Sequence, residues 1–354
     1  MHFLLWLVLQ STAALAVPTD YAFTHVPSRF QTRELTASSR ALGETCLSRG
    51  TMPDGTICNP AFLPELNEST LLGRLYLGNG YAALSTANNF IYQPLSKEFL
   101  QELFTRQNVT SLEAHAGLSF SSRYFSAEFS PYRVQYTHEV HNPNNAVIAI
   151  HAAVEKSFAL SAGLPLSALD SALDGFSFGA KLRVLSRDFV HGRFSMFEVA
   201  ASEEARSLLP MRSQTAVFVD PSVAWTSEGP WKKRVSFGFS NLGRVWPEDP
   251  LYPEPADLGF GLGLEPPVGF GSLKLGIDFA ELLHGESAMG RFRSGLSYRF
   301  GIVEAMAGYN QSATTVGLQF GFQLIRVGIV YEFLRADLEG GLSNRIATEM
   351  SAAL

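Results

Sequence analysis

Two histidines, His138 and His141, stand three residues apart in THEVHNPNN, a spacing that suits a metal ion if the segment is helical. Pro143 and the asparagines beside it instead predict a turn, so we expect a solvated loop without a metal. His115 and Ser119 share one face of a predicted strand, but nucleophilic catalysis also needs an orienting third group. We therefore predict no catalytic residue, no metal site, no cofactor and no enzymatic activity.

A second set of side chains is charged and lies on alternate positions near the C-terminus. On the polar faces of strands, they could line a conduit, or they could pair across strands and brace the fold, which is the role we expect for most. The predicted lumen-lining residues are Lys274, Asp278, Arg291, Arg293, Arg299, Glu304, Arg326 and Glu332. Asp220 also falls on the predicted polar face of its strand and could face the lumen, but Pro221 beside it favours a bulge or turn.

The elements that would position these charges are strands with alternating side chains. In residues 314–333, TTVGLQFGFQLIRVGIVYEF, two successive ribbons place an apolar side chain at every second position. Successive side chains of a strand point to opposite faces, so such a segment has one apolar face and one polar face. Further ribbons of this kind occupy 112–121, 132–137, 148–155, 258–264, 273–279 and 296–300.

Two architectures fit this alternation: a soluble β-sandwich with its apolar faces inward, or a membrane barrel with them outward. The polar positions combine charged residues with many glycines, as in a polar lumen. Many ribbons approach the length that crosses a bilayer as a tilted strand, and aromatic residues such as Tyr331 and Phe333 gather near strand ends. We therefore predict an all-β fold, a transmembrane antiparallel β-barrel in contact with lipid. Helical spacing predicts short insertions within 99–107 and 195–209.

Composition and the N-terminus bear on where the protein resides. The chain has 354 residues and a net charge of −6, which argues against nucleic acid as a partner. Residues 1–16 form an apolar run ending in Ala-Leu-Ala and predict a signal peptide, although a buried helix is the alternative. The only cysteines, Cys46 and Cys58, lie in a turn-rich loop that could close as a disulfide in an oxidising compartment, or remain as two free thiols.

The order of several segments resembles a known superfamily. VSFGFSNLG at 235–243 precedes a Pro-containing loop and a Gly-alternating strand, and LKLGIDFAELL, GLSYRF and VGIVYEF follow in turn. Near the front, CNPAFLP contains the Asn-Pro-Ala motif, Asn59, Pro60 and Ala61. Together these segments resemble the FadL-like outer-membrane β-barrels, in particular their PorV and TraF-type branch.

This resemblance implies a barrel of about 14 strands in the bacterial outer membrane, with residues 17–65 folded into the lumen as a plug and residues 66–354 forming the barrel. A periplasmic tail is the alternative for the first segment. The implied function is passage of a small hydrophobic molecule across the outer membrane. A non-transporting barrel that anchors or shuttles a secretion or envelope protein is the second hypothesis.

Overall fold

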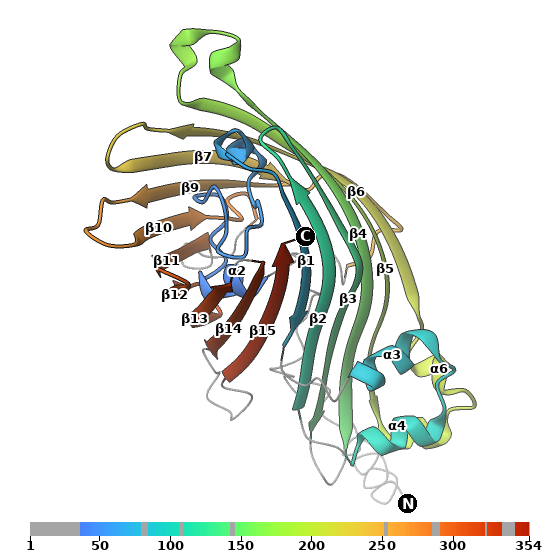
Figure 1. The fold of residues 1–354 in the computed structure, drawn as a ribbon. Helices are drawn as coiled ribbons and strands as arrows, with labels where there is room; N and C mark the ends of the chain where they lie inside the picture. The colour runs from blue at the N-terminus through green and yellow to red at the C-terminus, as the bar shows by residue number, and fades with distance from the viewer. Residues whose placement is uncertain are drawn as a thin grey trace, which may run out of the picture.

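The structure is a computed structural model, and its described residues are 36–78, 84–105, 109–141, 146–250, 254–284, 291–322, 324–334 and 344–353. Most of them belong to one antiparallel sheet that closes into a barrel (Figure 1). The predicted signal peptide lies outside the described residues.

The barrel closes because the first strand pairs with the last. Within the described residues the strands are β1 (Thr70–Leu77), β2 (Val109–Ser121), β3 (Phe125–His141), β4 (Val147–Pro165), β5 (Phe176–Ser195), β6 (Arg212–Thr226), β7 (Lys232–Ser240), β8 (Leu242–Trp246), β9 (Asp257–Glu265), β10 (Ser272–Phe279), β11 (Phe292–Phe300), β12 (Val303–Tyr309), β13 (Ala313–Phe322), β14 (Ile325–Leu334) and β15 (Asn344–Ala353). Consecutive strands pair, except that β7 pairs with β9 and β8 pairs with β6, and β1 pairs with β15. Since β7 and β8 follow one another along β6, these described strands occupy 14 positions around the barrel, which confirms the predicted fold.

A kink separates β7 from β8 at Asn241, whose φ of 60° lies in the left-handed region. On β6, Val219 pairs with Leu242 of β8, and Ser222 pairs with Gly238 of β7. Two residues of β6, Asp220 and Pro221, therefore lie opposite three residues, 239–241, of the facing segment. The Asp220 carboxylate accepts a hydrogen bond from the Asn241 backbone N–H at 2.6 Å. The wall therefore bends at the Asn-Leu-Gly segment, and the bulge expected beside Pro221 is present.

The outer surface of the barrel is apolar. Exposed side chains on it include Leu118, Phe129, Phe158, Leu182 and Phe237. A row of aromatic rings crosses five neighbouring strands with centroids 4.7 to 6.5 Å apart; its members are Phe237, Phe260, Phe279, Phe292 and Tyr309. Such a band with aromatic residues near its edge is typical of a barrel that faces lipid.

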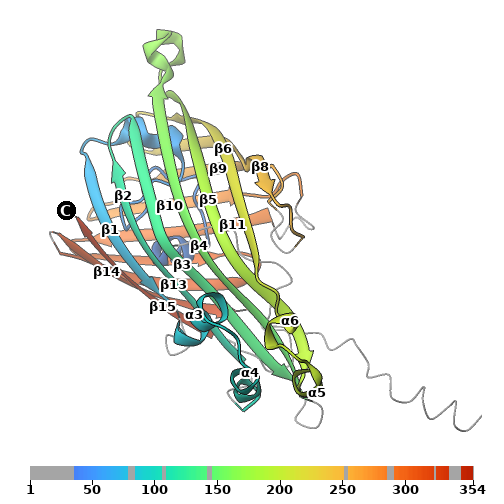
Figure 2. The same ribbon diagram turned by 90° about the vertical axis from the view of Figure 1, so that its right-hand side faces the viewer.

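Short helices cover the outside of the tallest part of the wall, where β3, β4 and β5 have 17, 19 and 20 residues. These helices are α3 (Leu84–Tyr92), α4 (Lys97–Leu103), α5 (Met196–Ala201) and α6 (Ala205–Leu208) (Figure 2). They bury an apolar cluster that includes Phe90, Leu100, Tyr136, Ile150 and Phe194. The helical insertions predicted from the sequence are therefore confirmed. Among the described residues, no helix has the length and apolar character needed to span a bilayer.

The predicted loop at His138 and His141 is wrong. Strand β3 continues to His141, which pairs with Val147 of β4. His138 is 2% exposed, and its Nδ1 lies 2.8 Å from the Tyr136 hydroxyl. The strand extends this far because the helices cover its outer face.

Candidate functional site

Residues 36–65 lie inside the barrel, surrounded by its strands (Figure 1). They contain helix α2 (Ala37–Ala41), which packs against β12 to β15, and the 3₁₀ helix η1 (Pro60–Glu65), which packs against β4 to β6. We call this segment the plug. Residues 17–35, which the sequence prediction also assigned to it, lie outside the described residues.

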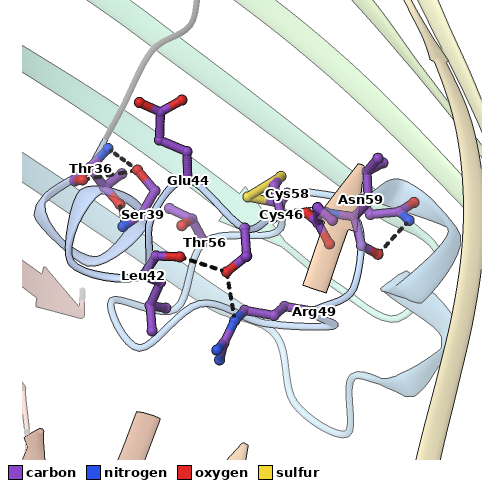
Figure 3. The surroundings of a disulfide bond; sticks show 12 residues. Thr36, Ser39, Leu42, Glu44, Cys46, Arg49, Thr56, Cys58 and Asn59 are labelled. Carbon is purple, nitrogen blue, oxygen red and sulfur yellow. Dashed lines mark hydrogen bonds between the residues drawn. A yellow bond between two sulfur atoms is a disulfide. The ribbon is translucent and has the colours of Figure 1, made fainter. Parts of the chain in front are cut away.

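The plug is closed by the Cys46–Cys58 disulfide, with the two Cα atoms 5.3 Å apart, and this confirms the predicted bond (Figure 3). Directly after it, the Asn59 side chain accepts a hydrogen bond from the Ala61 N–H at 3.0 Å and donates one to the Leu47 carbonyl at 3.3 Å. Proline at the first position of η1 loses no hydrogen bond there. The Asn-Pro-Ala motif thus caps η1 and ties it to the disulfide loop.

Asp278 on β10 holds the disulfide loop from the wall. Its carboxylate accepts hydrogen bonds from the backbone N–H groups of Cys46, Leu47 and Ser48 at 2.5, 2.7 and 2.9 Å. From the plug, Arg49 donates to the Gly295 carbonyl at 2.8 Å. Burial lowers the pKa of Arg49 to about 10, against the opposing charge of Asp278, so the guanidinium stays protonated at neutral pH.

Helix α2 is held by carboxylates on the wall. Glu349 accepts a hydrogen bond from the Ala37 N–H at 2.6 Å. Arg40 pairs with Glu113 on β2 and with Glu332 on β14, the latter at 3.2 Å. Burial alone would lower the pKa of Arg40, but the charge of Glu113 and its neighbours raises it well above the usual value. The cation is therefore permanent.

The end of η1 carries a third anchor. Glu65 accepts hydrogen bonds from Arg234 at 2.8 Å, Lys232 at 2.7 Å and Thr226 at 2.5 Å. Burial opposes the ionisation of Glu65, but these donors, Arg234 first, lower its pKa to about 2. The carboxylate consequently remains charged and bonded at neutral pH.

Glycines on the inner face mark where plug and wall touch. A Cβ added to Gly261, Gly263, Gly295 or Gly308 would come within 3.0 Å of plug backbone atoms. The sequence reasoning interpreted these alternating glycines only as part of a polar lumen. Their spacing was the available signal for a packed segment inside the barrel.

The eight predicted lumen-lining residues do not form one cluster. Asp278 and Glu332 bind the plug, Arg326 donates to the Pro53 carbonyl at 3.2 Å, and Arg293 lies 3.5 Å from Glu44 of the plug. Three others pair along the wall: Arg299 lies 2.6 Å from Glu304, and Lys274 lies 3.8 Å from Glu265. Arg291 directly precedes β11, and its carbonyl accepts from the Ala280 N–H. These contacts hold the plug or brace the wall.

A cavity of about 470 Å³ lies between the plug and the inner faces of β3 to β7, β9 and β10. On the plug side it reaches the disulfide, Leu47, Ile57 and Pro60. Its wall residues include Glu128, Ser157, Ala159, Lys181, Arg183 and Asp220. Asp278 and Arg293 from the predicted lumen-lining set also line it, and of the first six the sequence singled out only Asp220. The part of the chain that the structure describes contains no group of three or more His, Cys, Asp or Glu able to hold a metal.

Alternating charges cross the inner wall beside this cavity. Glu254, in the loop after β8, pairs with Arg187, which lies 3.6 Å from Glu155. Glu155 lies 3.5 Å from Arg133, and Arg133 lies 3.3 Å from Glu113, the partner of Arg40. Burial raises the pKa of Glu254, against the charge of Arg187. This charge ladder connects the loop after the kink to the plug.

No family model matches the sequence, and no curated protein matches it. The fold is similar to a TodX deltaS2S3 mutant monoaromatic hydrocarbon channel, with 12% identity, a TM-score of 0.50, and coverage of 92% of this chain and 98% of that one. A weaker likeness is to the Ralstonia pickettii toluene transporter TbuX, with 8% identity, a TM-score of 0.44, and coverage of 90% of this chain and 96% of that one. Another is to outer membrane phospholipase A from Escherichia coli, with 14% identity, a TM-score of 0.33, and coverage of 57% of this chain and 80% of that one. The first likeness shows that the two proteins share the barrel fold.

Proposed function

We propose that this protein passes a small hydrophobic molecule across the bacterial outer membrane, without chemical conversion. The observation that carries this proposal is a closed barrel, apolar outside, whose lumen holds a disulfide-closed plug beside a cavity of about 470 Å³. A cavity of this volume lies within the range that holds a small molecule. The fold likeness to a monoaromatic hydrocarbon channel is consistent with it.

The connections between strands suggest the orientation. At the end where β15 finishes, β11 and β12 are joined through residues 301–302 and β13 and β14 through 323–324. At the opposite end most connections are longer, and two of them carry α3 to α6; the exceptions are the short connection 310–312 at that end and the long connection 166–175 at the first end. Outer-membrane barrels have short periplasmic turns and longer external loops. The proposal therefore places the helices outside the cell and the end of β15 toward the periplasm.

The kink between β7 and β8 suggests where the solute leaves the cavity through the barrel wall. Strand β7 pairs with β9 as far as Ser240 and Asp257, whereas β8 pairs within the described residues with β6 alone. Ser240 and Asn241, at the point where the wall divides, also line the cavity. FadL-like proteins use a plug and a lateral opening for hydrophobic molecules, and the resemblance implies the same here. The solute would leave the cavity beside Asn241.

Uptake by intact cells tests this function, because a lipopolysaccharide layer slows hydrophobic solutes that cross a plain phospholipid bilayer freely. Expression of the protein should raise the initial uptake rate of radiolabelled toluene at micromolar concentration. Ala159→Trp, which fills the cavity, should remove the increase, whereas Leu160→Trp, on the outward side of the same strand, should leave it. Equal uptake with and without the protein, together with no binding of aromatic probes to the purified protein, would refute the proposal.

The PorV and TraF-type branch belongs with the second hypothesis, a barrel that anchors or shuttles a secretion or envelope protein. It is supported by the order of the sequence motifs around the kink and by the Asn-Pro-Ala motif. A stoichiometric protein partner recovered from solubilised membranes, together with absence of uptake, would favour it over transport.

A further inference from the structure

We propose that the solute of this cavity is an amphipathic ring compound, with an apolar body and one uncharged oxygen that accepts hydrogen bonds, rather than a plain hydrocarbon or an ion. This inference rests on the proposed transport function and names the class of molecule. It follows from the different chemistry of the two sides of the cavity.

The plug side offers an apolar surface. The disulfide, Leu47, Ile57 and Pro60 reach the cavity. The polar side chains of the plug that line the cavity already have partners: Thr36 and Ser39 cap one another, and Asn59 caps η1 (Figure 3). Thr56 donates to Asp54, and Glu44 lies 3.5 Å from Arg293 of the wall. This side is suited to the body of a ring.

The wall side is polar and is arranged around a small residue. Ala159 on β4 pairs with Glu128 of β3 and with Arg183 of β5, so its methyl group leaves a recess between two long side chains. Lys181 bonds to Glu128 at 2.9 Å, and Arg183 bonds to Asp220 at 2.9 Å. Polar atoms thus surround a recess that faces the apolar plug.

Hydrogen-bond donors remain available on this wall. The Lys181 ammonium donates to Glu128, and Arg183 uses Nε for Asp220 and Nη2 for Asn241, which leaves two ammonium protons and the Nη1 group of Arg183. An oxygen acceptor in the recess would satisfy such donors. A hydrocarbon would displace water from them and leave them without partners, at a cost in free energy.

The charges on this wall disfavour an ion. Each cation is already paired with a carboxylate, Lys181 with Glu128 and Arg183 with Asp220, so the recess presents no net charge from these four groups. A carboxylate or ammonium solute would lose its hydration without gaining an unpaired opposite charge. A neutral hydroxyl or carbonyl oxygen avoids this penalty.

Binding of fluorinated probes to the full-length protein in lipid nanodiscs tests the inference. Titrations followed by ¹⁹F NMR would compare 4-fluorobenzyl alcohol, 4-fluorotoluene and 4-fluorobenzoate, with the signal from Ala159→Trp subtracted as non-specific partitioning. We expect the alcohol to bind about tenfold more tightly than the toluene, which corresponds to about one net hydrogen bond, and the benzoate to bind most weakly.

Two variants connect the preference to the wall. Glu128→Leu combined with Lys181→Met removes the ion pair as a unit and should bring the ratio of alcohol to toluene affinity toward one. Ser157→Val, a milder change beside the recess, should lower the ratio, whereas the outward-facing Leu160→Met should not. A wild-type ratio of one or below, or tightest binding of the benzoate, would overturn this inference while leaving transport intact. Failure of every probe to bind, with no toluene uptake by cells, would overturn the function itself.

Discussion

Replacement of Asp278 by alanine should loosen the plug from a barrel that remains folded. The Asp278 side chain is 2% exposed and accepts three backbone N–H groups of the disulfide loop. Each hydrogen bond to a charged group contributes about 1.5–3 kcal/mol, but burying the carboxylate offsets part of the sum. We expect a net loss of about 3 kcal/mol, which raises the open population roughly 100-fold.

Hydrogen exchange followed by mass spectrometry measures this opening. The amides of Cys46, Leu47 and Ser48 should exchange roughly 100-fold faster in Asp278→Ala, because they exchange when the loop leaves the wall. Arg299→Gln is the matched control, since Arg299 pairs with Glu304 on the wall. Both variants should still migrate faster before boiling than after it, as folded barrels do. Unchanged protection of the three amides in a folded Asp278→Ala barrel would refute our account of how the plug is held.

Three further predictions concern the other plug contacts. Because the pKa of Glu65 is lowered to about 2 from an ordinary 4.5, its stabilisation of η1 is full above about pH 4.5 and is lost as the pH falls toward 2; limited proteolysis should show this release, and Glu65→Gln should abolish its pH dependence. Gly295→Val would bring a side chain against the plug backbone and should raise single-channel conductance in planar bilayers, whereas Gly269→Val, whose added Cβ would have no atom within 4 Å, should not. Reduction of the Cys46–Cys58 bond should destabilise its loop by about 3 kcal/mol, seen as faster amide exchange between the cysteines; equal rates before and after reduction would contradict this.

The sequence predicts the shorter strands, such as β13 and β14, well, because one face of each strand meets the polar interior and the other face meets an apolar environment. Residues 314–333 keep this alternation throughout and form β13 and β14. In the long strands β3 to β5 the alternation of polar and apolar residues weakens where helices cover the outer face. Phe189 and Val190 of β5 are neighbours in the chain, and both are fully buried. The alternation that identifies a strand is therefore lost there, and β5 was not predicted.

The candidate site is harder to predict, since its contacts join residues far apart in the chain. The alternation of its strand predicts that Asp278 points into the barrel. Its hydrogen bond to Leu47, however, joins residues 231 positions apart in the chain, and no local sequence pattern predicts it. The alternating glycines were the nearest clue, because a packed segment excludes side chains from the surface it touches. The polar recess around Ala159 lies in strands whose alternation was only partly visible, so its residues were not selected.

The short link between η1 and β1 limits how the plug can move. Only residues 66–69 separate Glu65 from the first residue of β1, a reach of about 17 Å even when fully extended. With Glu65 bonded to Lys232 and Arg234, η1 is moored close to the rim of the barrel. While Glu65 keeps these bonds, the plug cannot leave the barrel as a free body. Even if α2 and the disulfide loop lost their own contacts with the wall, they would stay tethered to it through η1. A channel of this design would reseal by itself after each passage.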